Sequence, residues 1–221
     1  MSSSSAAMLK IPPRPTRRTR AKRGGTKPTV EARLLAATER LLSQGHSFAM
    51  LSIEQLAAEA GMARATFYLH FRDKGELVAR LMDYFTQELT ESFGTWVQNA
   101  NIAERKDVRA AVSGMVETFK AHQAIVVAVR DTMPHDKVVE VLFEKMMETI
   151  SAMAQRSLGT VKRQGRSRPG ATEDVADTLA WIVALYCTYC MDKREGVSVE
   201  RVAKALGYIC ESAIFADEAK S

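Results

Sequence analysis

Small and hydrogen-bonding side chains are concentrated in the segment RATFYLH, residues 64–70. If this segment is helical, Phe67 and Phe71 lie on one face, four residues apart, and pack against a core. The opposite face then presents guanidinium, hydroxyl and imidazole groups to solvent. Such groups bind phosphates and the base edges of the DNA major groove. The exposed set comprises Arg64, Ala65, Thr66, Tyr68, Leu69 and His70.

Two local signals predict the elements that would position this face. Ser52 and Gln55 have the spacing of a capping box, in which each side chain bonds the other residue's backbone N–H, so a helix should begin there. Gly61 stands where a left-handed residue would end that helix. A preceding helix over residues 30–44 would be stopped by Gly45, and its apolar side chains would pack against the pair.

Two short helices joined by a glycine turn form a helix-turn-helix, which places its second helix in the DNA major groove. The same spacing also occurs in helical hairpins of ordinary bundles that never contact DNA. The spacing alone therefore leaves two interpretations open.

The segment LAAEAGMARATFYLHFRDKGEL, residues 56–77, resembles the signature of TetR-family transcriptional regulators. The resemblance implies that Arg64, Ala65 and Leu69 face base edges. Ala63 departs from the family, which often has a capping serine there; alanine weakens such a cap by about 1 kcal/mol, and one phosphate contact is expected to be absent. The resemblance implies a further set of DNA contacts, mainly to phosphates, from Ser52, Thr66, Tyr68, His70 and Lys74.

Positive charge is concentrated near the N-terminus. The chain has 31 Lys and Arg against 26 Asp and Glu, and eight of these cations, with no acid among them, lie in residues 1–28. Serines and prolines keep this segment from forming a core, so we predict a disordered basic tail, without the apolar stretch of a signal peptide. Such a tail either follows phosphates or the adjacent minor groove, or only solubilises the protein.

The chain from residue 76 onwards shows helical periodicity and no convincing strand. The sequence therefore predicts an all-α fold with three parts: a basic tail (1–28), a helix-turn-helix head (29–75) and a helical bundle (76–221) for ligand binding and dimerisation. With 46% apolar residues, the chain can bury a sizeable core. We expect helices over residues 74–93, 107–122, 123–132, 138–153, 173–194 and 199–216, with a loop over residues 165–171.

An apolar run of 13 residues, LAWIVALYCTYCM (179–191), lies in the penultimate predicted helix. It is too short to span a bilayer, which requires about 20 residues. A helix buried between its own core and a second subunit is the better interpretation. The resemblance implies the same arrangement, because TetR-family proteins form homodimers through their last two helices, and a palindromic operator in double-stranded DNA requires a two-fold axis.

Aromatic residues and methionines gather in the predicted bundle. Taken singly, each is more simply a core residue. As a set they would also suit a cavity for a small hydrophobic or amphiphilic effector, and the resemblance implies that its occupation alters the spacing of the two DNA-binding heads. The helices near Phe119 and Trp181 resemble the EthR-like branch of the family, which has a long hydrophobic tunnel. The candidate ligand residues are Trp96, Met115, Phe119, Phe143, Met146, Met147, Trp181, Leu185, Tyr186 and Tyr189.

No spacing of residues indicates a catalytic or metal site. Cys187 and Cys190 share an apolar helix with no acid or histidine at ligand spacing, and Cys210 lies on the next, so we expect buried free thiols in a reducing cytoplasm. We therefore predict no cofactor, no metal and no enzymatic activity. The sequence favours a ligand-responsive transcriptional repressor; the alternative is a helical small-molecule carrier or enzyme whose N-terminal helices dock a protein instead of DNA.

Deletion of residues 1–24 tests the role of the tail. If its cations contact phosphates, the deletion should flatten the plot of log affinity against log salt by roughly 0.9 for each lost contact, because fewer counterions are released on binding. Anisotropy titrations of full-length and truncated protein with one DNA duplex, at several salt concentrations, measure this slope. An unchanged slope would show that the tail only solubilises.

Overall fold

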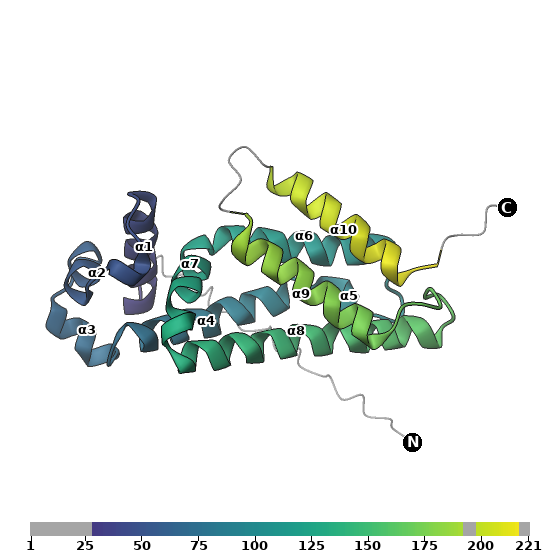
Figure 1. Ribbon diagram of the computed structural model, residues 1–221, viewed down its shortest axis with the longest axis horizontal. Coiled ribbons are helices and arrows are strands. Elements are labelled where there is room, and N and C mark those ends of the chain that lie inside the picture. Colours follow the sequence, from purple (N-terminus) through teal and green to yellow (C-terminus); the bar gives the residue numbers. More distant parts are fainter. Residues whose placement is uncertain (1–27, 192–197, 217–221) are drawn as a thin grey trace, which may run out of the picture.

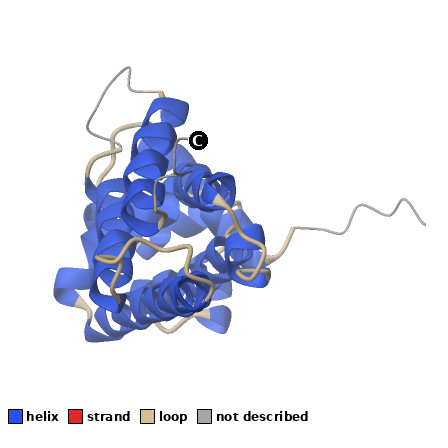
Figure 2. Ribbon diagram, turned by 90° about the vertical axis from the view of Figure 1, so that its right-hand side faces the viewer, coloured by secondary structure: helices blue, strands red, loops and turns tan. Residues whose placement is uncertain are grey.

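The computed structural model describes residues 28–191 and 198–216. Within these ranges the regular structure is helical, apart from an isolated antiparallel bridge between Ser167 and Phe215, so the predicted all-α fold is confirmed. The molecule is elongated, with a small head at one end (Figure 1), and the opposite end of the body also consists of helices joined by loops (Figure 2). The predicted basic tail lies outside the described residues, as does the segment 192–197.

The head consists of α1 (Val30–Ser43), the 3-10 turn η1 (Phe48–Met50), α2 (Ile53–Glu59) and α3 (Arg64–His70). The predicted capping box is confirmed, because the Gln55 N–H donates to the Ser52 hydroxyl (3.2 Å) and the Ser52 N–H donates to Gln55 Oε1 (2.8 Å). Gly45 and Gly61 follow α1 and α2 with φ values of 87° and 65°, a region that glycine adopts without steric cost.

A guanidinium group from α1 fixes the turn between α2 and α3. Arg33 Nε and Nη2 donate to the Ala60 carbonyl oxygen at 3.1 and 2.8 Å, and Nη2 also donates to the Gly61 carbonyl oxygen at 2.6 Å. The last carbonyl groups of a helix have no partner within the helix, and Arg33 supplies one here. The head also has its own core, formed by the buried side chains Leu34, Phe48, Leu56, Phe67 and Phe71.

Helix α4 (Lys74–Glu91) joins the head to the body, and both of its ends are tightly packed. At its start, a Cβ atom on Gly75 would lie 2.0 Å from Oδ2 of Asp136, the residue that caps α8 (Lys137–Arg163). At its end, a Cβ atom on Gly114 of α6 (Arg105–Ala121) would lie 2.7 Å from the Ser92 carbonyl oxygen. These approaches require glycine, so α4 meets α8 and α6 almost backbone to backbone.

Two helix pairs dominate the body. α6 packs along α10 (Val199–Ile214), and α8 packs along α9 (Glu173–Tyr189) (Figure 1). The first pair is linked by an ion pair between Arg109 Nη1 and the buried Glu211 Oε2, at 2.6 Å. α7 (Gln123–Thr132), followed by η2 (Met133–His135), contacts both α1 and α4. Among the described residues, no helix combines the length and apolar character needed to cross a membrane.

Two parts of the body differ from the sequence-based expectation. The helix expected over residues 74–93 ends at Glu91, and a short helix that we did not predict, α5 (Gly94–Gln98), follows it, because Gly94 adopts a φ of 51° that turns the chain. Helix α8 continues past residue 153 to Arg163. Its last turns keep an apolar stripe, since Leu158 and Val161 are buried.

Two helical glycines should respond in opposite ways to alanine. Gly114→Ala places a methyl group against a backbone oxygen that moves only if α4 shifts, so we expect the free energy of unfolding to fall by about 1–3 kcal/mol. On Gly159 of α8, a Cβ atom meets nothing nearer than Arg163 Nη1 at 3.7 Å. Gly159→Ala should therefore raise the free energy of unfolding by about 0.5–1 kcal/mol, because alanine has the higher helix propensity.

Urea unfolding of both variants at one fixed protein concentration measures these changes. If the two substitutions changed the free energy of unfolding in the same direction, the tight contact between α4 and α6 would be contradicted.

Candidate nucleic-acid interface and cavity

Helix α3 has a buried face and an exposed face. Phe67 and Phe71 are 0% and 1% exposed, as the sequence predicts. Successive residues of an α-helix are about 100° apart, so the side chains two positions before and after Phe67 point away from the core. These are Ala65 and Leu69, both exposed, and Leu69 has an exposed fraction of 83%. We call this pair the crest of α3.

A polar flank lies on one side of the crest. Arg64 Nη2 donates to the Tyr68 hydroxyl at 3.3 Å, and the guanidinium carbon lies 5.3 Å from the centroid of the Tyr68 ring. Arg64 Nη1 also forms an ion pair with Glu54 Oε1 of α2, at 2.8 Å. A backbone hydrogen bond at Glu54, and after it the Arg64 charge, lower the pKa of the Glu54 carboxyl, which is therefore ionised at neutral pH. Sequence reasoning missed Glu54, because the pair depends on how α2 and α3 cross.

The second flank carries Thr66, which is half-buried, and His70, which is exposed. The structure thus surrounds the apolar crest with hydrogen-bonding groups on both sides. Ser52, at the start of α2, accepts from the Gln55 N–H and keeps its own hydroxyl hydrogen for donation. Helix α3 itself begins at Ala63 without a side-chain cap, as expected for alanine.

Lys74 makes contacts that the sequence did not predict. Its Nζ donates to the carbonyl oxygens of Phe48, Ala49 and Leu51 at 3.1, 3.0 and 2.7 Å, and lies 5.2 Å from the centroid of the Phe48 ring. An ammonium group has three N–H donors, so these bonds occupy all of them. Burial lowers the pKa of Lys74. The structure thus gives Lys74 a role inside the protein, and its phosphate contact stays a prediction.

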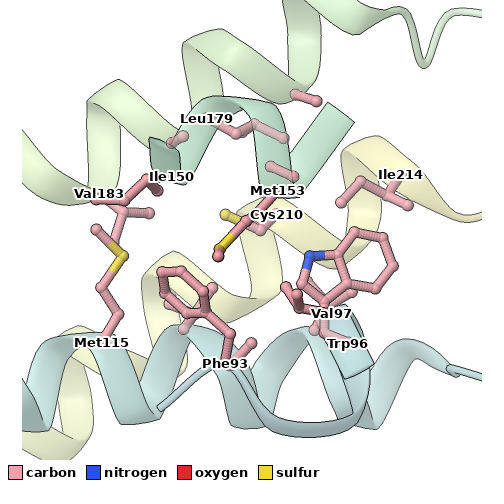
Figure 3. A pocket seen from close by; sticks show the side chains of 16 residues that line it. Phe93, Trp96, Val97, Met115, Ile150, Met153, Leu179, Val183, Cys210 and Ile214 are labelled. Atoms are coloured by element: carbon pink, nitrogen blue, oxygen red, sulfur yellow. The ribbon is translucent and has the colours of Figure 1, made fainter. Parts of the chain in front are cut away.

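A cavity of about 70 Å³ lies in the body among α5, α6, α8, α9 and α10 (Figure 3). Its lining is apolar: the only polar hydrogens on the lining side chains are the indole N–H of Trp96 and the thiol of Cys210. Burial raises the pKa of the Cys210 thiol to about 12, so this group stays neutral. Trp96 and Met115, both among the ligand residues proposed from the sequence, lie on the lining, and Figure 3 shows them with Phe93, Met153 and Val183.

The other proposed ligand residues lie elsewhere. Three of them, Phe119, Phe143 and Met146, border a separate hollow of about 10 Å³, and Met147 is completely buried in the core. Residues 179, 180 and 183 of α9 line the cavity, and the helical repeat directs the remaining side chains of α9 to its other faces. The expectation that one cavity gathers the whole set is therefore corrected for Phe119, Phe143, Met146, Met147, Trp181, Leu185, Tyr186 and Tyr189.

Apolar side chains are exposed on α9 and α10. The exposed fractions are 45% for Ile182, 39% for Leu185, 65% for Tyr208 and 48% for Ile209. Isolated exposed apolar residues are ordinary, whereas several on neighbouring helices are typical of an interaction surface. In the part of the chain that the structure describes, the histidines, cysteines and acids form no group that could hold a metal ion.

Comparisons with known proteins agree with this geometry. Residues 34–81 match the family model for bacterial regulatory proteins of the TetR family. The HTH-type transcriptional regulator EthR of Mycolicibacterium smegmatis is 25% identical over 188 residues, which cover 84% of this chain and 86% of that protein.

Solved structures share the fold. The fatty acid degradation regulator FadR from Bacillus halodurans superposes with a TM-score of 0.66 at 13% identity, covering 84% of this chain and 96% of that chain. AibR in complex with isovaleryl coenzyme A and operator DNA has a TM-score of 0.61 at 16% identity, covering 81% of this chain and 96% of that chain. With its helix-turn-helix head, the family match over that head and a relative aligned along most of its length, the chain belongs to the TetR family of bacterial regulatory proteins.

Proposed function

We propose that the protein is a homodimeric transcriptional repressor that binds a palindromic operator and is released from it by a small apolar or amphiphilic ligand. The exposed surface of α3 is the observation that carries DNA binding. Hydrogen-bonding groups flank its crest, while Phe67 and Phe71 anchor the helix and Arg33 fixes the preceding turn. A helix held and exposed in this way suits the major groove. AibR, which has the same fold, was solved with operator DNA.

A second copy of the chain is the expected partner of the apolar surface on α9 and α10. In a two-fold dimer the same patch is used by both subunits, so Ile182, Leu185, Tyr208 and Ile209 would be covered without any other protein. The two-fold axis would present two α3 helices to half-sites spaced by about 34–36 Å or a multiple of that distance. This arrangement explains why the operator should be palindromic.

The alternative is a helical carrier or enzyme whose N-terminal helices dock a protein. The two hydrogen-bonding flanks of α3 and the family match over the head favour DNA. We assign the protein no catalytic activity, and its action on a bacterial operator would place it in the cytoplasm.

The apolar cavity is the candidate effector site. At about 70 Å³ it is smaller than the roughly 300–1,000 Å³ of sites for drug-sized ligands, so such a ligand must widen it. The flexible side chains of Met115 and Met153 can adapt to its shape. Further widening would displace α6, whose residues Val108, Ala111 and Val112 form one wall.

Helix α4 would carry this displacement to the head. α6 touches the end of α4 at the contact between Gly114 and Ser92, and Lys74 at the start of α4 is bonded to the η1 segment. A ligand shifts the conformational equilibrium only by its differential affinity for the two states. An inducer must therefore bind the free dimer more tightly than the DNA-bound dimer, and by linkage DNA weakens inducer binding equally.

Substitutions on one flank of α3 test DNA recognition. Tyr68→Phe should weaken binding to operator and random duplex alike, because a hydroxyl bound to phosphate carries no sequence information. Arg64→Ala should lower the discrimination between these duplexes by about 1–3 kcal/mol, if its guanidinium exchanges Glu54 for a base edge. Anisotropy titrations with an operator selected from a random duplex pool measure both effects. Equal losses on both duplexes for Arg64→Ala would remove its base-reading role.

Linear alcohols test the effector site. In a Trp181→Phe variant, Trp96 on the cavity lining is the remaining tryptophan of the chain's two, so its fluorescence reports occupation. From 1-hexanol to 1-decanol we expect the affinity to rise by about fourfold per methylene, with a matching loss of operator affinity.

The variant Ala111→Leu, which adds bulk to the cavity wall, should reduce alcohol binding. Alcohols that bind the cavity but leave operator affinity unchanged would show that this site does not control DNA release.

A further inference from the structure

The crest of α3 is apolar although its surroundings are polar. Leu69 is as exposed as Met50, the other most exposed large apolar side chain of the head, at 83% each. Ala65 stands one turn earlier on the same line. Because the crest lies opposite the Phe67 side of the helix, it enters deepest when α3 docks in a groove. The chemistry of these two side chains therefore decides what the centre of the helix can recognise.

The polar side chains of α3 leave the crest uncovered. Arg64, the longest of them, is held at the flank by Glu54 and by Tyr68. A leucine cannot satisfy the amino and carbonyl groups on base edges, and pressing it against them would remove their water without replacing it. The one apolar group that the major groove displays is the 5-methyl of thymine.

We propose that Leu69, with Ala65 beside it, reads thymine through its 5-methyl group, so that each half-site has a T·A pair facing the crest. This inference rests on the proposed operator binding. Leu69 supplies the main contact, since Ala65 has a single methyl. The two residues are separated by about 6 Å along the helix axis, which allows them to face methyl groups on nearby base pairs.

Deoxyuridine scanning isolates the methyl group. An operator is first selected from a random duplex pool with the full-length protein, and each thymine is then replaced singly by deoxyuridine, which keeps Watson–Crick pairing. Titrations at one fixed salt concentration should show a position in each half-site where the replacement weakens binding by about fourfold, the value of one buried methyl. Unchanged affinity at every position would overturn the inference.

A double-mutant cycle assigns the contact to Leu69. Leu69→Ala should bind the thymine and deoxyuridine operators with nearly equal affinity. Met50→Ala removes an equally exposed apolar side chain from outside α3 and should retain the full deoxyuridine effect. If Leu69→Ala remained as sensitive as the parent protein, another residue would read the methyl and the inference would be overturned.

The same experiment separates this inference from the proposed function. A pool that yields an enriched palindrome without any deoxyuridine effect overturns the reading of thymine and leaves operator binding supported. A pool that yields no enriched sequence overturns operator binding, and the reading of thymine with it.

Discussion

The placement of the head depends on one partly buried ammonium group. Lys74 Nζ donates to three carbonyl oxygens of the η1 segment and the residue that follows it. Burial lowers the pKa of Lys74 because the charged form has lost water, and the three oxygens replace part of that hydration. Since Lys74 is also the first residue of α4, pulling the helix from the head would leave polar groups without partners, which is costly.

This attachment makes α4 an extension of the head within the body. Near its start α4 meets the cap of α8 at Gly75 and Asp136, and at its end it meets α6 at Ser92 and Gly114. Close-packed contacts of this kind transmit displacement, because protein interiors have few voids and low compressibility. The wall of the cavity formed by α6 is therefore connected to α3 through two tight contacts and one cluster of hydrogen bonds.

The head could be predicted because its determinants are local: the Ser52 cap and the pair Phe67 and Phe71 involve residues no more than four positions apart. Contacts between distant segments could not be predicted in this way. Residue type grouped Trp96 with aromatic residues of α9, whereas helical phase decides which side chains line the cavity. The spacing of residues also does not encode how helices cross, so the carbonyl partners of Lys74 and the pair of Glu54 with Arg64 emerged only in the structure.

The cavity lining comes entirely from residues after α4, and the surface facing DNA comes from residues that precede it. A substitution on the lining changes the shape offered to an effector and leaves the crest and its flanks untouched. A substitution at Leu69 changes the operator and leaves the cavity as it was. The two specificities can therefore evolve separately, so that a duplicated gene for this chain can acquire a new signal while its copy still represses the old promoter.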